Sequence, residues 1–430
     1  MNRREFAWAL YDWANSAFPT VVTTFVIATW FAQGVAGDPV AGQAQWGWMQ
    51  TGAGIAIAFL SPVLGAVADA GGRRRLMLAI CTLATAALTA ALWFAHPAPA
   101  WAGYVLLCVG LATVAFEVGT VFYNAMLPGV ASPARIGRLS GLAWGLGYAG
   151  GLACLLVCLF GLIRPDPAPF GLDRAAGEPV RATALLVGAW ILAFGWPVLM
   201  AVPDPRGPRP GWAEAARAGL REIAAVLRGL PARPNMLRFL LARLFYTDGL
   251  NTLFAFGAIF AAGVHGLSFQ EVLLFGIAMN VSAGLGAALG GLVEDRVGSR
   301  RMVLVSLWCL AAIGVAIVLT EGVTLFWCLA LTLGLFFGPA QAASRTLMAR
   351  LAPPEEMAAH FGLFALSGRI TGFLGPAVLA FVTQASGSQR AGIATTAAFM
   401  AFGAVLLAGV RESGAVLTQG APPPGPPPGA

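Results

Sequence analysis

Long apolar stretches recur along the whole chain and alternate with short polar segments. Each stretch is close to the roughly 20 residues that an α-helix needs to cross the hydrocarbon core of a bilayer. A helix satisfies its own backbone hydrogen bonds, so it is the structure that such a stretch adopts in lipid. The pattern predicts twelve transmembrane helices, at residues 8–33, 46–69, 75–95, 101–126, 137–161, 181–202, 237–263, 270–293, 301–320, 322–349, 361–385 and 390–410.

The longest polar segment lies in the middle of the chain and divides these spans into two sets of six. We predict an all-α membrane protein of two pseudo-symmetric six-helix bundles, with an N-terminal half at 1–202 and a C-terminal half at 237–411. The linker 203–236 carries apolar residues at helical spacing beside arginines, which predicts an amphipathic helix at the membrane surface. A solvated linker helix is the alternative. The Pro- and Gly-rich tail, 412–430, is predicted to be disordered.

Composition agrees with this interpretation, because 58% of the residues are hydrophobic and only 10% are charged. Such a chain cannot cover a surface of ordinary charge density in water. All six cysteines fall within predicted spans, where they act as small apolar residues rather than as a disulfide or metal framework. The start of the chain shows no cleavage site, so we expect the first span to remain in the mature protein.

The basic residues of this chain are all arginines, and their positions indicate which loops lie in the cytoplasm. If the N-terminus is cytoplasmic, only Arg164, Arg174, Arg181 and Arg390 fall in loops on the opposite side. Positive residues favour cytoplasmic loops, so we expect a multi-pass protein of the plasma (inner) membrane with both termini in the cytoplasm. The net charge of +7 then needs no nucleic-acid partner.

Two loops share the same spacing of glycine, aspartate and arginine, one after the second span and one after the eighth. The first glycine of each permits close helix approach, the second permits a tight turn, and the arginines hold the loop at the cytoplasmic surface. The first loop has Gly65, Asp69, Gly72, Arg73 and Arg74, and the second has Gly291, Asp295, Gly298, Arg300 and Arg301.

The two halves share further sequence marks. Asp12 and Asn15 in the first span match Asp248 and Asn251 in the seventh, as Asp-x-x-Asn-Ser/Thr-x-Phe. The Asp and the Asn of each copy share a helix face. Residues 124–141 also align without gaps on residues 345–362. Internal repeats of transporters place the substrate site at their interface, so we predict a site between Asp12/Asn15 and Asp248/Asn251.

Ionisable residues within spans are costly and are therefore candidates for function. Glu117 is our first candidate for a coupling proton, and it shares a helix face with Asn124. Arg345 is a candidate for binding a substrate carboxylate, although it could as easily neutralise Glu117 or Asp12. Arg243 and Arg369 are the remaining candidates among the ionisable residues within or beside the spans. The alternative for Asp12 and Asp248 is a static role that fixes helix geometry.

The paired loops resemble the signature loop of the major facilitator superfamily. Residues 11–18 (Tyr-Asp-Trp-Ala-Asn-Ser-Ala-Phe) resemble a hallmark of its vacuole-effluxer-like family, as do segments that contain Tyr123, Asn124, Gln341 and Arg345. The resemblance implies that the loops latch the cytoplasmic side and that the first, fourth, seventh and tenth helices line a central cavity. It also implies that glycines of the fifth, eighth and eleventh spans lie where the halves rock; general helix packing is the alternative.

The resemblance to fungal members implies export of neutral amino acids. We therefore expect a monomeric, proton-coupled carrier of a small polar metabolite, an amino acid above all, without metal or cofactor. A carrier of a sugar, peptide or drug and a transporter-derived receptor are the alternatives. An enzyme is not expected, because the three histidines form no metal motif and no paired catalytic aspartates occur.

Overall fold

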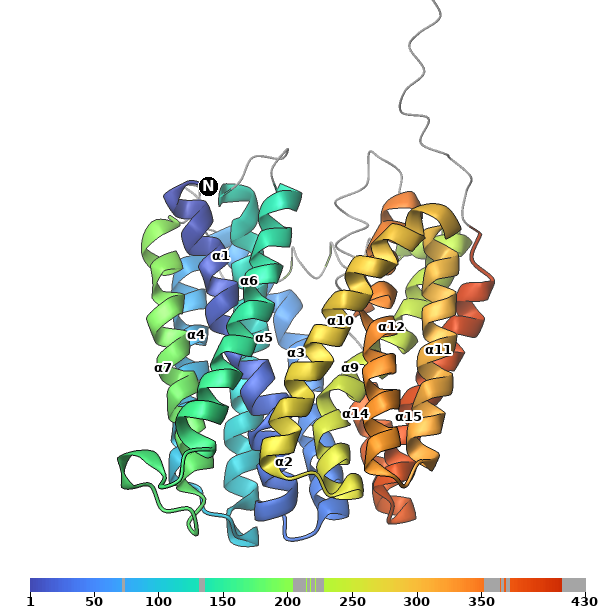
Figure 1. The fold of residues 1–430 in the computed structure, drawn as a ribbon. Coiled ribbons are helices and arrows are strands. Elements are labelled where there is room, and N and C mark those ends of the chain that lie inside the picture. The colour runs from blue at the N-terminus through green and yellow to red at the C-terminus, as the bar shows by residue number, and fades with distance from the viewer. Residues whose placement is uncertain are drawn as a thin grey trace, which may run out of the picture.

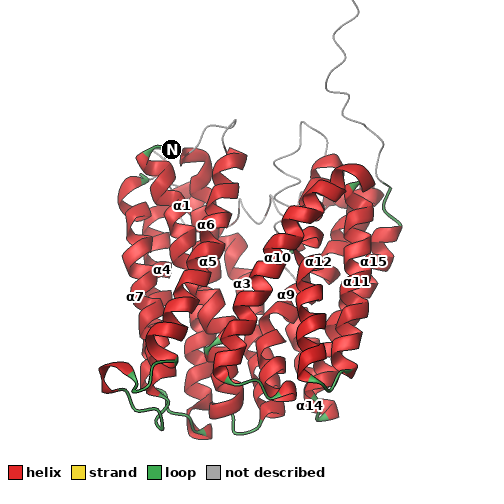
Figure 2. Ribbon diagram, in the orientation of Figure 1, coloured by secondary structure: helices red, strands yellow, loops and turns green. Residues whose placement is uncertain are grey.

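The computed structural model describes residues 1–71, 74–130, 136–203, 228–351 and 372–411, together with positions 214, 217, 221, 364, 367 and 368. Throughout these residues every regular element is a helix, as Figure 2 shows. Most of the linker, the tail from residue 412, Gly72, Arg73 and Arg369 lie outside the described residues. The predicted amphipathic linker helix and the disordered tail therefore stay predictions.

Eleven of the twelve predicted spans fall on helices of the described part of the chain, and the span 361–385 is described continuously only from residue 372. Ten helical stretches there are long and apolar enough to cross a membrane, and a shorter apolar helix falls on the eleventh predicted span. The N-terminal bundle consists of α1 (Arg3–Asn15), η1 (Phe18–Phe25), α2 (Ile27–Trp30), η2 (Phe31–Val35), α3 (Pro39–Gly71), α4 (Arg74–Ala91), α5 (Ala102–Val130), α6 (Ile136–Val157), η5 (Cys158–Ile163) and α7 (Glu178–Ala201). The C-terminal bundle consists of α9 (Pro234–His265), α10 (Phe269–Val297), α11 (Ser299–Leu319), α12 (Val323–Leu351), α14 (Leu374–Ser386) and α15 (Gln389–Ala408).

Local sequence explains where several helices begin and which face they turn outward. Asn2 and Glu5 form a reciprocal capping box at the start of α1, with both hydrogen bonds at 2.8 Å. On α4 the exposed side chains of Leu76, Ile80 and Leu83 recur four and three residues apart. They form an apolar stripe on one helix face, which suits contact with lipid tails.

The helices group into two bundles that meet toward one end (Figure 1). We call the end with Arg3 and Arg411 the terminal face, and the end with the loops at Gly37 and Gly387 the distal face. The ribbons of the two bundles lie apart toward the terminal face and side by side toward the distal face. Helix α3 packs on α5 of its own bundle and on α14 of the other, so it joins the two.

Glycines allow close helix contact inside the N-terminal bundle. A Cβ added at Gly150 of α6 would lie 2.3 Å from the carbonyl oxygen of Trp13, and one at Gly147 would lie 2.7 Å from Ser16 Oγ. In the C-terminal bundle, Gly286 of α10 similarly meets the backbone of Leu335 on α12. Gly147, Gly150 and Gly286 thus make packing contacts within their own bundle. Helix packing was the alternative to a surface on which the two halves rock.

We predict that Gly150→Ala prevents α6 from seating on α1, because its Cβ would collide with backbone atoms that cannot rotate away. Overpacking of this kind destabilises by about 1–3 kcal/mol. The purified variant should melt at a lower temperature and yield less monodisperse protein on size exclusion. Gly145→Ala is the matched control, since nothing lies within 4 Å of a Cβ at that position. Equal behaviour of the two variants would contradict the packing argument.

Candidate functional site

The first transmembrane helix is interrupted directly after the Asp12–Asn15 motif. Helix α1 ends at Asn15, and the following segment, η1, contains Pro19 and has π-helical geometry, with Val26 N donating to Val21 O at 2.9 Å. Pro19 has no N–H, so the usual hydrogen bond to the carbonyl of Asn15 cannot form. Local π geometry inside helices is frequent at functional sites. The matching residues Asp248 and Asn251 lie instead in the unbroken helix α9.

Asp12 lies within a set of stacked aromatic side chains that ties α1 to α5. Trp8 Nε1 donates to the Tyr123 carbonyl at 3.1 Å, and the Tyr123 hydroxyl donates to the Trp8 carbonyl at 3.0 Å. Their rings stack with centroids 4.5 Å apart. The ring of Tyr11, the residue before Asp12, also stacks on the Tyr123 ring, with centroids 4.8 Å apart. Tyr123, a predicted site residue, is therefore buried against α1 rather than facing an open space.

Asp248 is buried between α9 and the start of α14. Its Oδ2 accepts a hydrogen bond from the backbone N–H of Gly375, the second residue of α14, at 2.7 Å. The positive end of the α14 dipole thus lies against the carboxyl group. A Cβ at Gly375 would come within 2.2 Å of Thr252 Oγ1 and 3.0 Å of Asp248 Oδ1. This geometry makes Asp248 a cap for α14, the static role left open by the sequence.

Arg243 lies just over one turn before Asp248 on α9 and holds the residues that precede α14. Its Nη1 donates to the Phe364 carbonyl at 2.6 Å and to Ser367 Oγ at 2.8 Å. The guanidinium carbon lies 3.5 Å from the centroid of the Phe364 ring. A cation at a carbonyl and an anion at a helix start match the polarity of the helix ends that they contact. Arg243 and Asp248 together fix the eleventh span against the seventh.

The remaining predicted residues differ in exposure. Asp248 finds its hydrogen-bond partner, Gly375, in its own bundle. Arg345, on α12, is exposed and acts electrostatically on Tyr148 of α6 and on Arg243. Asn124 and Asn251 are exposed, Glu117 and Gln341 are half-buried, and Asn15 is buried.

The structure describes part of each of the two repeated loops that follow the second and eighth spans. Gly298 joins α10 to α11 with a φ of 86°, a conformation that favours glycine and explains the second glycine of the motif. Just before it, the buried Glu294 carboxylate accepts a hydrogen bond from Ser299 Oγ at 2.6 Å. Gly65 and Asp69 lie in α3, and Gly291 and Asp295 lie in α10. The latch role of these loops stays a prediction.

A set of glutamine side chains joins the two bundles at the distal face. Gln43 Nε2, on α3, donates to Thr383 Oγ1 at 2.9 Å and to the Gln389 carbonyl at 3.3 Å. Gln389 Nε2 reciprocates by donating to the Pro39 carbonyl at 2.8 Å. Gly47 of α3 packs on Ala380 of α14 close by. We call Gln43, Thr383 and Gln389 the distal clasp; no repeat in the sequence pointed to it.

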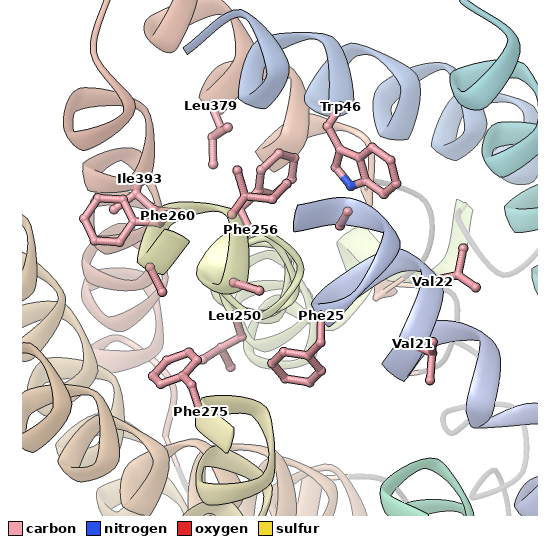
Figure 3. Close-up of a cluster of buried hydrophobic side chains, with 14 of the residues drawn as sticks. Val21, Val22, Phe25, Trp46, Leu250, Phe256, Phe260, Phe275, Leu379 and Ile393 are labelled. Atoms are coloured by element: carbon pink, nitrogen blue, oxygen red, sulfur yellow. The ribbon is translucent and has the colours of Figure 1, made fainter. Parts of the chain in front are cut away.

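Beneath the distal clasp, an apolar cavity of about 70 Å³ lies between the first helix and the C-terminal bundle. Phe25 of η1 enters this region and makes an edge-to-face contact with Phe254, with ring centroids 6.0 Å apart. Figure 3 shows Phe25 near Leu250 and Phe275. Aromatic and aliphatic side chains from both bundles thus close the interior toward the distal face. Sequence reasoning missed this aromatic set, because aromatic residues are common in any apolar span.

Fold comparison assigns the class of protein. A solved bacterial homologue of the human lysosomal transporter Spinster superposes with a TM-score of 0.72, at 19% identity over 94% of this chain and 95% of that one. A D-xylose–proton symporter gives 0.69, at 15% identity over 95% and 98%. At such identities the likeness shows the fold alone. The chain has the major facilitator fold of membrane transporters.

Sequence comparison assigns the family. Residues 53–418 match the family described as vacuole effluxer Atg22 like, and the chain belongs to this family. An uncharacterized MFS-type transporter, YxiO of Bacillus subtilis, is 25% identical over 95% of both chains. Autophagy-related protein 22 of Cryptococcus neoformans is 26% identical over 59% of this chain and 49% of its own length. The chain thus spans about half of that fungal relative.

We predict that Asp248→Ala destabilises the protein by about 1–3 kcal/mol, because it leaves the buried Gly375 N–H without an acceptor. Asp248→Asn should largely restore stability, since an amide oxygen still accepts that hydrogen bond. Thermal unfolding in detergent measures both. Asn251→Ala, an exposed position on the same helix, is the control. A fully stable Asp248→Ala variant would rule out the capping role.

We also predict that Gln43→Ala shifts the protein toward a state that is open at the distal face. The change removes two hydrogen bonds between the bundles, each worth about 0.5–1.5 kcal/mol. In a background whose native cysteines are replaced by serine, a cysteine at the buried position Ala44 should react faster with an impermeant maleimide. Trp48→Phe removes only the exposed bond to Gln384 and should change the rate less. Unchanged labelling in Gln43→Ala would refute the clasp.

Proposed function

We propose that this protein is a secondary active transporter that exports amino acids by alternating access, coupled to protons. The observation that carries the proposal is the one-sided closure of the two bundles. Hydrogen bonds and aromatic contacts join them at the distal face, whereas their ribbons lie apart toward the terminal face (Figure 1). Alternating access requires the two bundles to close first at one face and then at the other.

The distribution of arginines supports a cytoplasmic terminal face. At the distal face, Arg181 donates to the Trp93 carbonyl at 2.9 Å, and Arg390 donates to the carbonyls of Val318 and Thr320. Arg174 likewise binds the carbonyls of Ile163 and Pro165. These arginines are engaged in fixing loops and helix ends. The larger share at the terminal face fits the positive-inside rule in the inner membrane.

A zwitterionic substrate fits the polar groups that remain exposed between the bundles. The Arg345 guanidinium presents a planar pair of donors that suits a carboxylate. Asn124, Asn251 and Gln341 add neutral donors and acceptors on α5, α9 and α12. The family's effluxer description supports export, and an amino acid as the exported solute is our inference for this chain. A sugar or nucleoside carrier remains the second candidate, since two of the similar folds move such solutes.

Glu117 is our candidate for the proton-coupling group. It lies in the middle of α5, directly after Phe116, whose ring packs against Phe18 at the interruption of the first helix. A carboxyl group at that depth can bind and release a proton as its access to water changes. Asp248, the acid of the C-terminal repeat, accepts a hydrogen bond from the Gly375 N–H at the start of α14.

The test is transport in proteoliposomes with an imposed proton gradient. Leucine, alanine and tyrosine are tested beside xylose and uridine. We expect gradient-driven flux of at least one amino acid. Glu117→Gln should lose that flux but keep counterflow exchange, which needs no net proton movement. Glu321→Gln, at an exposed helix end, should transport like the wild type. Flux of xylose or uridine alone would move the assignment to the second candidate, and no flux of any solute would defeat the proposal.

A further inference from the structure

Four arginines surround an open polar pocket at the terminal face of the C-terminal bundle. They are Arg238 near the start of α9, Arg300 and Arg301 at the start of α11, and Arg411 just after α15. The pocket has a volume of about 660 Å³ and reaches the end of α10 at Val297. Residues that are far apart in the sequence therefore bring four positive charges around one concave site. We call this set the arginine pocket.

Backbone carbonyls hold part of the arginine pocket in place. Arg300 Nη2 donates to the Ala408 carbonyl at 2.5 Å, and Arg238 Nη1 contacts the Gly409 carbonyl at 3.4 Å. The backbone of Arg411 is fixed by Asn235, whose side chain accepts from its N–H at 2.7 Å and donates to its carbonyl at 2.6 Å. These contacts use only part of the donor capacity of the guanidinium groups, each of which carries five N–H donors.

The charge of the arginine pocket is not balanced by the described carboxylates. No ion pair joins the side chains of these four arginines to a carboxylate among the residues that the structure describes. Glu294, at the end of α10, is buried and accepts from Ser299. Four like charges that converge on one site, with no described carboxylate beside them, favour the binding of a multivalent anion.

The geometry points to a phosphate group as the ligand. Guanidinium forks match phosphate oxygens bidentately, and such charge-assisted bonds are stronger than those of neutral pairs. The pocket lies at the ends of membrane-spanning helices, which is the depth of lipid headgroups. Basic pockets between helices at this depth suit anionic phospholipid heads. We propose that the arginine pocket binds the phosphate of an anionic phospholipid and so links the ends of α9, α11 and α15.

Lipid binding to the full-length protein tests this proposal. The probes are cardiolipin and phosphatidylglycerol, with phosphatidylcholine as the neutral lipid and glycerol 3-phosphate as the soluble phosphate. Native mass spectrometry counts bound lipid, and a detergent titration gives apparent affinity. Arg238→Gln/Arg301→Gln removes two exposed charges, and Arg164→Gln/Arg174→Gln removes two from the distal face as the matched control. We expect the first double variant to bind cardiolipin roughly tenfold more weakly or worse and the control to bind it like the wild type.

The outcomes separate the two sources of phosphate. Preference for cardiolipin and phosphatidylglycerol over phosphatidylcholine, lost only in Arg238→Gln/Arg301→Gln, supports the lipid site. Equal loss in both double variants, or no preference for anionic lipid, overturns it. Arginine-dependent binding of glycerol 3-phosphate without such a preference assigns the pocket to a soluble phosphate and also overturns the lipid source. If the double variant elutes as aggregate, Arg301→Gln alone is used, because Arg301 makes no hydrogen bond to a described residue.

Discussion

The structure depends on one constraint, that backbone hydrogen bonds cannot be left unmade inside a bilayer. Where a helix is interrupted, something else must satisfy or shield the freed groups. In the first span, Pro19 breaks the ladder and π-helical geometry resumes it further on, with Val26 bonding to Val21. In the eleventh span, Asp248 accepts from Gly375 at the start of α14, and Arg243 holds the carbonyl of Phe364 upstream. The two copies of the Asp-x-x-Asn repeat thus both lie at helix breaks, one in its own helix and one in the neighbouring helix.

This arrangement separates rigid parts from movable ones. Within the N-terminal bundle, Gly150 lets α6 contact the backbone of Trp13, which gives a contact that cannot slide without collision. Between the bundles, the distal clasp consists of a few hydrogen bonds that can exchange with water. Polar contacts of modest strength can be broken and remade at a low free-energy difference, whereas interlocked backbones cannot. A carrier that alternates between two closures needs this contrast.

The arginines divide in the same way, into some that hold helices and loops in place and others that stay exposed. Arg243 is buried and serves helix geometry, and the distal arginines bind carbonyls at loops and helix ends. Arg345 is exposed on α12, where the proposed substrate carboxylate would bind. The four arginines of the arginine pocket converge at the terminal face without a described carboxylate beside them. Identical side chains thus differ in role according to what surrounds them.

The sequence by itself determined the class of the protein and the places of its spans, because apolar length and backbone satisfaction in lipid leave only the helix. It also identified Asp12, Asp248 and the turn glycine Gly298, since repeats mark positions that a duplicated fold uses twice. The sequence could not assign their roles. Only the tertiary structure showed that Asp248 caps α14, that Tyr123 bonds to Trp8 and that Gln43 meets Thr383 and Gln389. These partners lie 100 to several hundred residues apart and follow no periodic pattern, so helix packing alone brings them together.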